Sequence, residues 1–146
     1  MMRIALASDH AGFDYKEKIK LYLLEKKFEV CDFGTHSRDM VDYPQMIRPA
    51  ALAVSQKECE RGIILGGSGN GEAIVANRIP GIRCAVCWDV KSARLAREHN
   101  DANIISIGQR MSSLDLALKI IETWLQSEFA GGRHLRRIQQ IDEEPS

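Results

Sequence analysis

The stretch GIILGGSGNGEAIVANR at residues 62–78 decides how this chain can fold. It starts with a short apolar run, which is typical of a buried strand. Four glycines then fall within the six positions 66–71, and they permit positive φ angles and close backbone approach. A loop of this kind at the start of a helix directs several N–H groups at an anion. A tight strand-to-helix turn is the alternative, but it does not need four glycines. The stretch therefore predicts a strand, an anion-binding loop and a helix.

Glu72, the residue at which this loop ends, restricts the kind of anion. The dinucleotide fingerprint G-x-G-x-x-G, started at Gly67, places its last glycine at Glu72. The phosphate loop G-x-x-x-x-G-K, started at Gly66, places its lysine at the same position, where a carboxylate would repel phosphate. A better role for the loop is to hold an oxyanion that develops during a reaction, with Glu72 as a general base. A first-turn glutamate favoured by the helix dipole is the alternative that the residues alone leave open.

On both sides of the loop, short β-rich runs alternate with amphipathic stretches. This alternation predicts a doubly wound, flavodoxin-like α/β fold, with helices on both faces of a five-stranded parallel sheet and a single domain over residues 1–146. If the strand order is 2-1-3-4-5, the topological switch point lies between strands one and three, where Asp9, His10 and the glycine loop follow the strands. The expected strands are Arg3–Ser8, Glu29–Phe33, Gly62–Leu65, Arg83–Trp88 and Asn103–Ile107.

Capping residues indicate where helices begin. Asp89 is expected to cap a helix that runs towards His99. Ser112 with Asp115 resembles a capping box at the start of a later helix with a wide apolar stripe. The remaining expected helices include one over Tyr43–Cys59, with the helix-kinking Pro49 inside it, and one over about residues 131–142.

Composition excludes several classes of protein. The 20 basic residues equal the 20 acidic ones, which argues against a general nucleic-acid or membrane-surface binder. The longest apolar runs are strand-sized and no signal peptide is recognisable, so we expect a soluble, cytoplasmic protein. Cys84 and Cys87 form a C-x-x-C, but residues three apart on a strand point to opposite faces. We interpret them, like Cys31 and Cys59, as core residues rather than as a metal or redox site.

Two further groups of residues carry chemistry. His99 lies at the expected end of a helix and can transfer protons near neutral pH; a helix C-terminal residue favoured by the dipole is the alternative. Arg133 and Arg137 are four positions apart, so on a helix they share a face and could grip one phosphate. Their alternative is a solvated basic helix or a nucleic-acid contact, and the second is a poor option in a neutral protein.

Six motifs extend over nearly the whole chain: ASDHAGF at 7–13, DFGTHS at 32–37, DYP at 42–44, GGSGNGEAIVANRIPGIRCA at 66–85, AREHNDANIISIGQR at 96–110 and GGRHLRR at 131–137. With them the chain resembles the type B ribose-5-phosphate isomerases and the related galactose-6-phosphate isomerase subunits. The resemblance implies interconversion of a sugar phosphate between aldose and ketose, in the pentose phosphate pathway, with no metal and no cofactor. It also implies a homodimer whose active sites draw on both subunits, or a dimer of dimers, that binds neither nucleic acid nor membrane.

The resemblance assigns roles to individual residues. Many members carry a cysteine where this chain has Gly66, and that cysteine is their base; this chain resembles a subgroup in which Glu72 is the base instead. His99 would be the acid that opens the furanose ring, and Ser68 would add a hydroxyl to the loop. The implied substrate contacts are Asp9, His10, Gly67, Ser68, Gly69, Asn70, Gly71, Asn100, Arg110, Arg133 and Arg137, the last two from the partner subunit through the helix at about 131–142, with Tyr43 as a further candidate.

The expected reaction interconverts ribose 5-phosphate and ribulose 5-phosphate by proton transfer through an enediolate. This reaction needs a base beside the reacting carbons, donors at the oxygens and a distant anchor for the phosphate. One alternative is isomerisation of a six-carbon sugar phosphate such as allose or galactose 6-phosphate. Another is a non-catalytic module that binds a sugar phosphate or a flavin.

Overall fold

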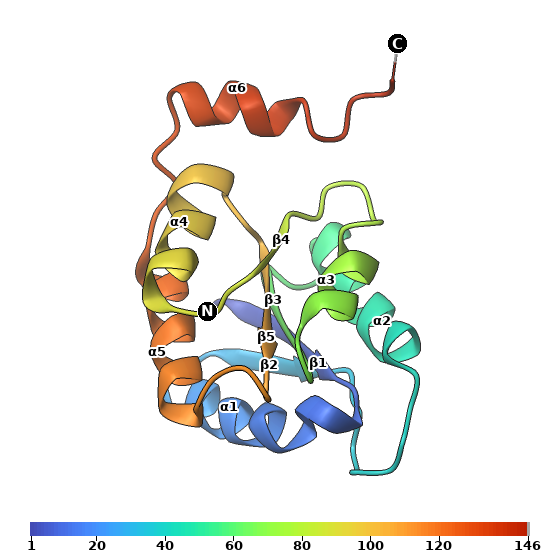
Figure 1. Cartoon of the computed structure of the whole chain (residues 1–146). Helices are drawn as coiled ribbons and strands as arrows, with labels where there is room; N and C mark the ends of the chain where they lie inside the picture. The colour runs from blue at the N-terminus through green and yellow to red at the C-terminus, as the bar shows by residue number, and fades with distance from the viewer. Residues whose placement is uncertain (146) are drawn as a thin grey trace.

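A computed structural model describes residues 1–145, and their strands form one parallel sheet (Figure 1). The order of the five strands within this part of the chain is β2-β1-β3-β5-β4. The doubly wound α/β fold expected from the sequence is confirmed. The strands are β1 (Arg3–Ser8), β2 (Glu29–Asp32), β3 (Arg61–Gly66), β4 (Cys84–Val86) and β5 (Ile104–Gly108).

The strand order differs from the expected 2-1-3-4-5 at one edge of the sheet. β5 pairs directly with β3, from Gly62 to Gly66, and β4 lies outside β5. Every residue of β5 is buried, whereas the three residues of β4 are only half-buried. A strand covered on both faces must be apolar throughout, while an edge strand can be short and partly exposed. The difference leaves the switch point between β1 and β3 in place.

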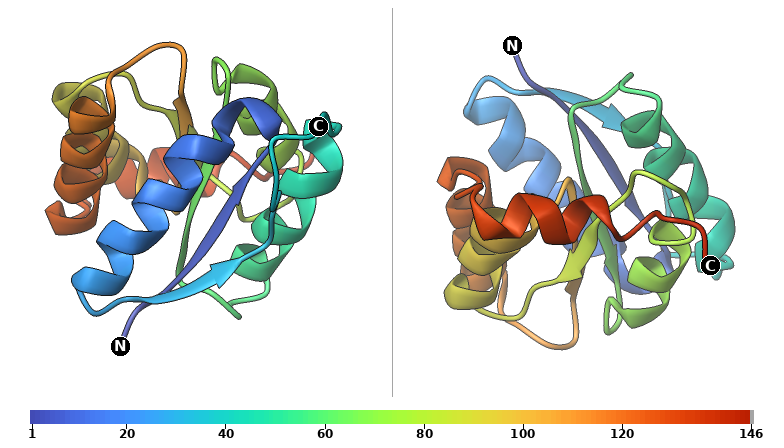
Figure 2. Two further views of the ribbon diagram at one scale, coloured as in Figure 1. Left: turned by 90° about the horizontal axis from the view of Figure 1, so that it is seen from below. Right: turned by 90° about the horizontal axis from the view of Figure 1, so that it is seen from above.

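Helices cover both faces of this sheet (Figure 2). Successive residues of a strand point to opposite faces. Ile63 therefore packs with Trp124 in the core beneath α1, α4 and α5, whereas Ile64 packs with Ala50 beneath α2 and α3. In the described residues the helices are the 3₁₀-helix η1 (His10–Gly12), α1 (Phe13–Glu25), α2 (Tyr43–Ser55), α3 (Asn70–Ala76), α4 (Val90–Asn100), α5 (Leu114–Gln126) and α6 (Arg133–Gln139).

The caps show which boundaries the sequence predicted correctly. Asp89 caps α4 as expected, in a capping box with Ser92. The expected cap Ser112 is wrong by one residue, because Ser113 Oγ accepts the Leu116 N–H at 3.2 Å and starts α5. α6 is shorter than the expected 131–142.

Among the elements that end earlier than the sequence predicted are α2 and β4. α2 stops at Ser55 rather than Cys59, because Lys57 adopts a left-handed φ of 62°. It continues through Pro49, which is exposed. β4 stops before Trp88, whose N–H already donates to the Ser92 hydroxyl at the start of α4. Both ends are therefore set by local backbone and capping geometry.

The cysteines behave as core residues. Cys87 packs in the cluster with Trp124, and Cys84 packs against the cluster on the other face. All four cysteines, which lie within the described residues, are free thiols. Burial raises the pKa of Cys59 and of Cys87 to about 12, so these groups are protonated at neutral pH. Within residues 1–145, no helix is long and apolar enough to cross a membrane.

Candidate active site

The carboxyl ends of β1, β3 and β5 bring most of the predicted site residues to one edge of the sheet (Figure 1). Asp9 and His10 follow β1, the glycine loop follows β3, and Arg110 lies two residues after β5. These are the neighbouring central strands of the sheet, so their ends converge. This is the edge at which open α/β sheets bind ligands.

The glycine loop is held in one conformation by its neighbours. Gly69 has a φ of 86°, the left-handed region that glycine adopts most readily, immediately before α3. The buried Ser106 hydroxyl of β5 donates to the Gly69 carbonyl at 2.7 Å. The Ser68 hydroxyl accepts the Asn70 N–H at 3.2 Å. The loop therefore presents a fixed set of backbone groups to a ligand.

Glu72 lies in the first turn of α3 with its side chain turned into the protein, and it is only 4% exposed. Its carboxylate occupies the space in which a side chain at residue 66 would begin, because a Cβ built on Gly66 would overlap both carboxylate oxygens. Burial raises the pKa of Glu72, the nearby charge of Asp9 raises it further, and a hydrogen bond from its own backbone N–H opposes the shift. A carboxylate held in this way is a stronger base than an exposed glutamate.

Asp9 and His10 are fixed beside this glutamate. Asp9 is almost fully buried, and its Oδ1 accepts the N–H groups of Ala11 and Gly12 at 2.9 and 3.1 Å. His10 Nδ1 accepts the Val41 N–H at 3.2 Å, so the neutral ring carries its proton on Nε2 and can donate it to a ligand.

Tyr43 and Arg110 bound the glycine loop on two sides. A Cβ at Gly71 would lie 2.7 Å from Tyr43 Cζ, which shows how closely the phenol ring approaches the loop. A Cβ at Gly67 would lie 2.9 Å from Arg110 Nη1, and the Arg110 backbone N–H donates to the Gly67 carbonyl at 3.0 Å. The exposed guanidinium of Arg110 can thus reach an anion bound over the loop.

The other predicted residues lie at the opposite, amino edge of the sheet. α4 returns the chain from the end of β4, so His99 and Asn100, in its last turn, lie near the start of β4. The Asn100 carbonyl accepts Arg83 Nε at 2.8 Å, and Arg83 immediately precedes β4. One chain therefore does not bring His99 to Glu72.

α6 carries the two predicted arginines along this same amino edge (Figure 2). The His99 and His134 rings stack with their centroids 4.3 Å apart and join α6 to α4. Partial burial lowers the pKa of His134, and the positive charges of His99, Arg133 and Arg137 lower it further. Arg133 and Arg137 make this surface electropositive beside the stacked rings of His99 and His134.

Sequence reasoning missed two residues that hold the loop. Ser106 was hidden in a run expected to be a buried strand, yet a single hydroxyl in the apolar stretch IISIG is a signal that such a group has a partner. Gln109 lies in the motif at 96–110, but no pattern in the sequence indicates that it holds the loop. Its backbone N–H donates to the Gly66 carbonyl at 2.8 Å, and its side-chain oxygen accepts the Tyr15 N–H at 3.0 Å. Ser106 thus ties the loop to β5, and Gln109 ties it to α1.

The carboxyl edge thus has a buried carboxylate, a histidine with a free ring N–H and a rigid loop of backbone groups. Among residues 1–145, no three His, Cys, Asp or Glu side chains are placed to hold a metal ion. Fold and site define an α/β protein equipped for acid–base chemistry on a small polar ligand.

Comparison with known proteins specifies the class further. The model of the protein family described as Ribose/Galactose Isomerase matches residues 4–141 of this chain. Ribose-5-phosphate isomerase B of Escherichia coli is 43% identical over 97% of this chain and 95% of its own length. The enzyme of the same name from Mycolicibacterium paratuberculosis is 44% identical over 97% and 91%. The structure of ribose-5-phosphate isomerase B from Clostridium thermocellum superposes with a TM-score of 0.95 at 50% identity, covering 96% of this chain and 95% of the other. This chain belongs to the ribose/galactose isomerase family.

Proposed function

We propose that this protein interconverts ribose 5-phosphate and ribulose 5-phosphate, with Glu72 as the base. The observation that carries the proposal is the buried Glu72 carboxylate, held against Gly66 at the start of α3 beside the glycine loop. Full-length relatives at more than 40% identity share the name of this isomerase. Burial and the charge of Asp9 raise the pKa of Glu72, which suits it to accept and return a proton.

In the proposed reaction, Glu72 removes the proton from C2 of the open-chain aldose. The electron pair of the broken C–H bond forms the enediolate, and its oxygens lie against the loop backbone and Ser68. The hydroxyl proton on O2 passes to O1, and protonated Glu72 delivers its proton to C1, which leaves the C2 carbonyl and the C1 hydroxyl of the ketose. Because the loop is already fixed by Ser106 and Gln109, its donors need little reorganisation as charge develops.

The glutamate base also accounts for glycine at position 66. We infer that this chain belongs to the subgroup in which the glutamate replaces a cysteine base. The Glu72 carboxylate already fills the space next to the Gly66 Cα, so a side chain there and this position of Glu72 exclude each other. The buried thiols have raised pKa values, which fits a reaction without a cysteine base.

We also propose that two chains form a homodimer with shared active sites. His99 and the α6 arginines can join Glu72 only if a second chain brings its amino edge to the carboxyl edge of the first. Support for the interface comes from the β4 edge, where Trp88 is 62% exposed, Ile74 is 61% exposed, and β4 itself is half-buried. Apolar side chains gathered along the outer edge of an edge strand are typical of an interaction surface.

In this dimer, His99 supplies the proton that opens the furanose ring, and Asn100 contacts the sugar. Arg133 and Arg137 of the partner and Arg110 of the first chain bind the phosphate. Fixing the phosphate at one end orients C1 and C2 beside Glu72, because the binding energy of a non-reacting group can be used to position the reacting one.

The decisive experiment replaces Glu72 by glutamine. The neutral amide has nearly the same shape, so Glu72→Gln should fold and bind ribose 5-phosphate, while kcat falls by about 100- to 10,000-fold through loss of the base. A coupled assay for ribulose 5-phosphate measures kcat, and exchange of the C2 proton with deuterated water measures the proton transfer itself.

Asp115→Asn is the matched control, because Asp115 is also an acidic residue in the first turn of a helix but is exposed on α5. It should retain full activity. Near-normal turnover by Glu72→Gln would exclude Glu72 as the base.

A further inference from the structure

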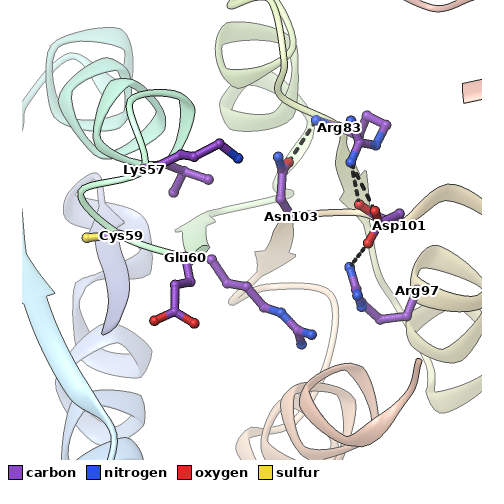
Figure 3. Close-up of a pocket in the computed structure, with 9 residues that line it drawn as sticks. Lys57, Cys59, Glu60, Arg83, Arg97, Asp101 and Asn103 are labelled. Carbon is purple, nitrogen blue, oxygen red and sulfur yellow. Dashed lines mark hydrogen bonds and ion pairs between the residues drawn. The ribbon is translucent and has the colours of Figure 1, made fainter. Parts of the chain in front are cut away.

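A second cavity lies at the amino edge of the sheet, near the starts of β3, β4 and β5 (Figure 3). Its volume is about 330 Å³. This is at the small end of the roughly 300–1,000 Å³ that ligand sites occupy. None of the residues implied as substrate contacts lines it. The charged residues of its wall, which we call the amino-edge pocket, are Lys57, Glu60, Arg61, Arg83, Arg97 and Asp101.

Positive charge exceeds negative charge in this pocket, since four cationic side chains face two carboxylates. Asp101 is shared by two arginines: its Oδ1 lies 2.7 Å from Arg97 Nη1, and its Oδ2 lies 3.5 Å from Arg83 Nη2. Both ion pairs are visible in Figure 3. Asp101 therefore balances two guanidinium groups at once, and among residues 1–145 no carboxylate lies within ion-pair distance of Lys57.

Arg61 is a half-buried cation without a paired carboxylate. Its Nη1 donates to the Trp124 carbonyl at 3.2 Å, and its guanidinium lies 5.2 Å from the centroid of the Trp124 ring. Among residues 1–145, no carboxylate lies within ion-pair distance of it. Burial, with the repulsion of Arg97, lowers the pKa of Arg61 to about 10. The site therefore strains the charged form of Arg61, which a bound anion would relieve.

Arg97 contributes an unused donor. The residue is only 8% exposed, and its Nε is buried without a hydrogen-bond partner in the described part of the chain. Buried guanidinium N–H groups normally have an acceptor. Lys57, held in a left-handed conformation just after α2, extends into the same space (Figure 3). An anion in the pocket would face the positive charges of Arg97, Arg61 and Lys57 together.

We propose that the amino-edge pocket binds a small oxyanion, namely inorganic phosphate or a phosphate monoester. Guanidinium groups recognise tetrahedral oxyanions by paired hydrogen bonds, and a lysine adds a mobile point charge. This site is separate from the glycine loop, because the two lie at opposite edges of the sheet. The proposal does not depend on the isomerase assignment.

The test is a titration of the ¹⁵N-labelled protein with inorganic phosphate, followed by amide chemical shifts. The amides of Gly62 and Asn103 report the amino-edge pocket, and those of Gly67 and Gly71 report the glycine loop. We expect saturable shifts at Gly62 and Asn103. Arg61→Gln should weaken phosphate binding at these amides by about tenfold, the usual scale for one charge-assisted contact, and Lys57→Gln by severalfold.

Arg48→Gln is the control for net charge, because Arg48 is an exposed arginine of α2 that does not line the pocket. It should leave the titration unchanged. Lys57 is exposed and accepts substitution readily, so it tests the proposal even if Arg61→Gln fails to fold. Absence of saturable shifts at Gly62 and Asn103, or equal phosphate affinity in wild type and Lys57→Gln, would overturn the proposal. Shifts at Gly67 and Gly71 alone would assign phosphate to the glycine loop and would also overturn the proposal.

Discussion

A side chain at residue 66 would compete for space with the carboxylate of Glu72, the proposed base. The Glu72 carboxylate lies where a Cβ of residue 66 would be, so glycine is needed there for room. The backbone of Gly66 does not adopt a left-handed φ, so alanine would suit the backbone at this position. Its Cβ, however, would overlap the Glu72 carboxylate.

Gly66→Ala should therefore expel the Glu72 carboxylate from its position. We expect kcat to fall by about 100-fold or more, and the overpacked site to lose about 1–3 kcal/mol of unfolding free energy. Denaturant titration and the isomerase assay measure the two effects.

The double variant Gly66→Ala/Glu72→Ala separates these effects. Removing the carboxylate makes room for the new methyl group, so stability should recover while activity stays low. Such non-additivity is expected of residues in contact. Additive stability losses would show that the two side chains do not compete.

The pH dependence of activity should report the environment of Glu72. Its pKa is raised by burial and by Asp9, and the base must be ionised, so the acidic limb of kcat/KM should lie above the usual range of glutamate. Asp9→Asn keeps a side-chain oxygen for the Ala11 and Gly12 N–H groups but removes the charge. The limb should then move to lower pH. An unchanged limb would mean that another group controls it.

The raised pKa of Glu72 also determines how this residue's contribution to stability changes with pH. A carboxyl group whose pKa is raised by folding holds its proton more tightly in the folded chain, so its contribution is most favourable at low pH and is lost as the pH rises through the folded pKa. Relative to wild type, Glu72→Gln should thus gain unfolding free energy as the pH is raised from the acidic side towards neutrality.

At the scale of elements, the sequence predicted every strand because each is a short apolar run. It did not predict that β5 lies between β3 and β4, because strand–helix alternation is the same for either order. The observed order agrees with burial, because β5 is buried at every residue, as a central strand must be, whereas β4 is only half-buried.

The contacts within one chain were predictable because they depend on strand ends, whereas the proposed contribution of a second chain does not follow from the topology. Asp9 and Glu72 follow central strands, so their meeting follows from the parallel sheet. His99 ends a helix that returns the chain to the amino edge, so the same topology separates it from Glu72. Its proposed meeting with Glu72 rests on the family resemblance together with this separation. The amino-edge pocket was missed because Arg61, Arg83 and Arg97 are far apart in sequence and have no motif in common.

Ser112 and Ser113 provide a test of helix capping at one site. Ser113 Oγ caps α5, whereas Ser112 Oγ is buried without a partner among the described residues. Ser113→Ala should lower the unfolding free energy by about 1 kcal/mol, the usual contribution of an N-cap. Ser112→Ala should be neutral or slightly stabilising, because it removes an unsatisfied hydroxyl. If thermal denaturation showed a larger loss of stability for Ser112→Ala than for Ser113→Ala, Ser112 would be the cap.

At the scale of the whole molecule, the proposed dimer predicts complementation between inactive chains. Glu72→Gln and His99→Asn affect opposite edges, so a mixed dimer has one site with both defects and one intact site. Co-expressed in equal amounts, the two variants should recover about a quarter of wild-type activity, because half of the dimers are mixed and each has one working site.

Glu72→Gln combined with Asp9→Ala is the matched control for this mixing experiment. Both residues belong to the carboxyl edge, so every site in the mixed dimer carries one defect. This pair should recover nothing. If Glu72→Gln and His99→Asn also give no more than the sum of the separate variants, each chain builds its site alone.

In the proposed dimer, the division of each active site between two chains also determines how activity depends on the amount of protein. Each chain would carry two half-sites and be folded but silent, so the rate at high dilution would rise with the square of the chain concentration and become linear only once pairing is complete. Specific activity would then measure assembly, and a cell could reduce the flux through this reaction by lowering chain abundance without unfolding any molecule.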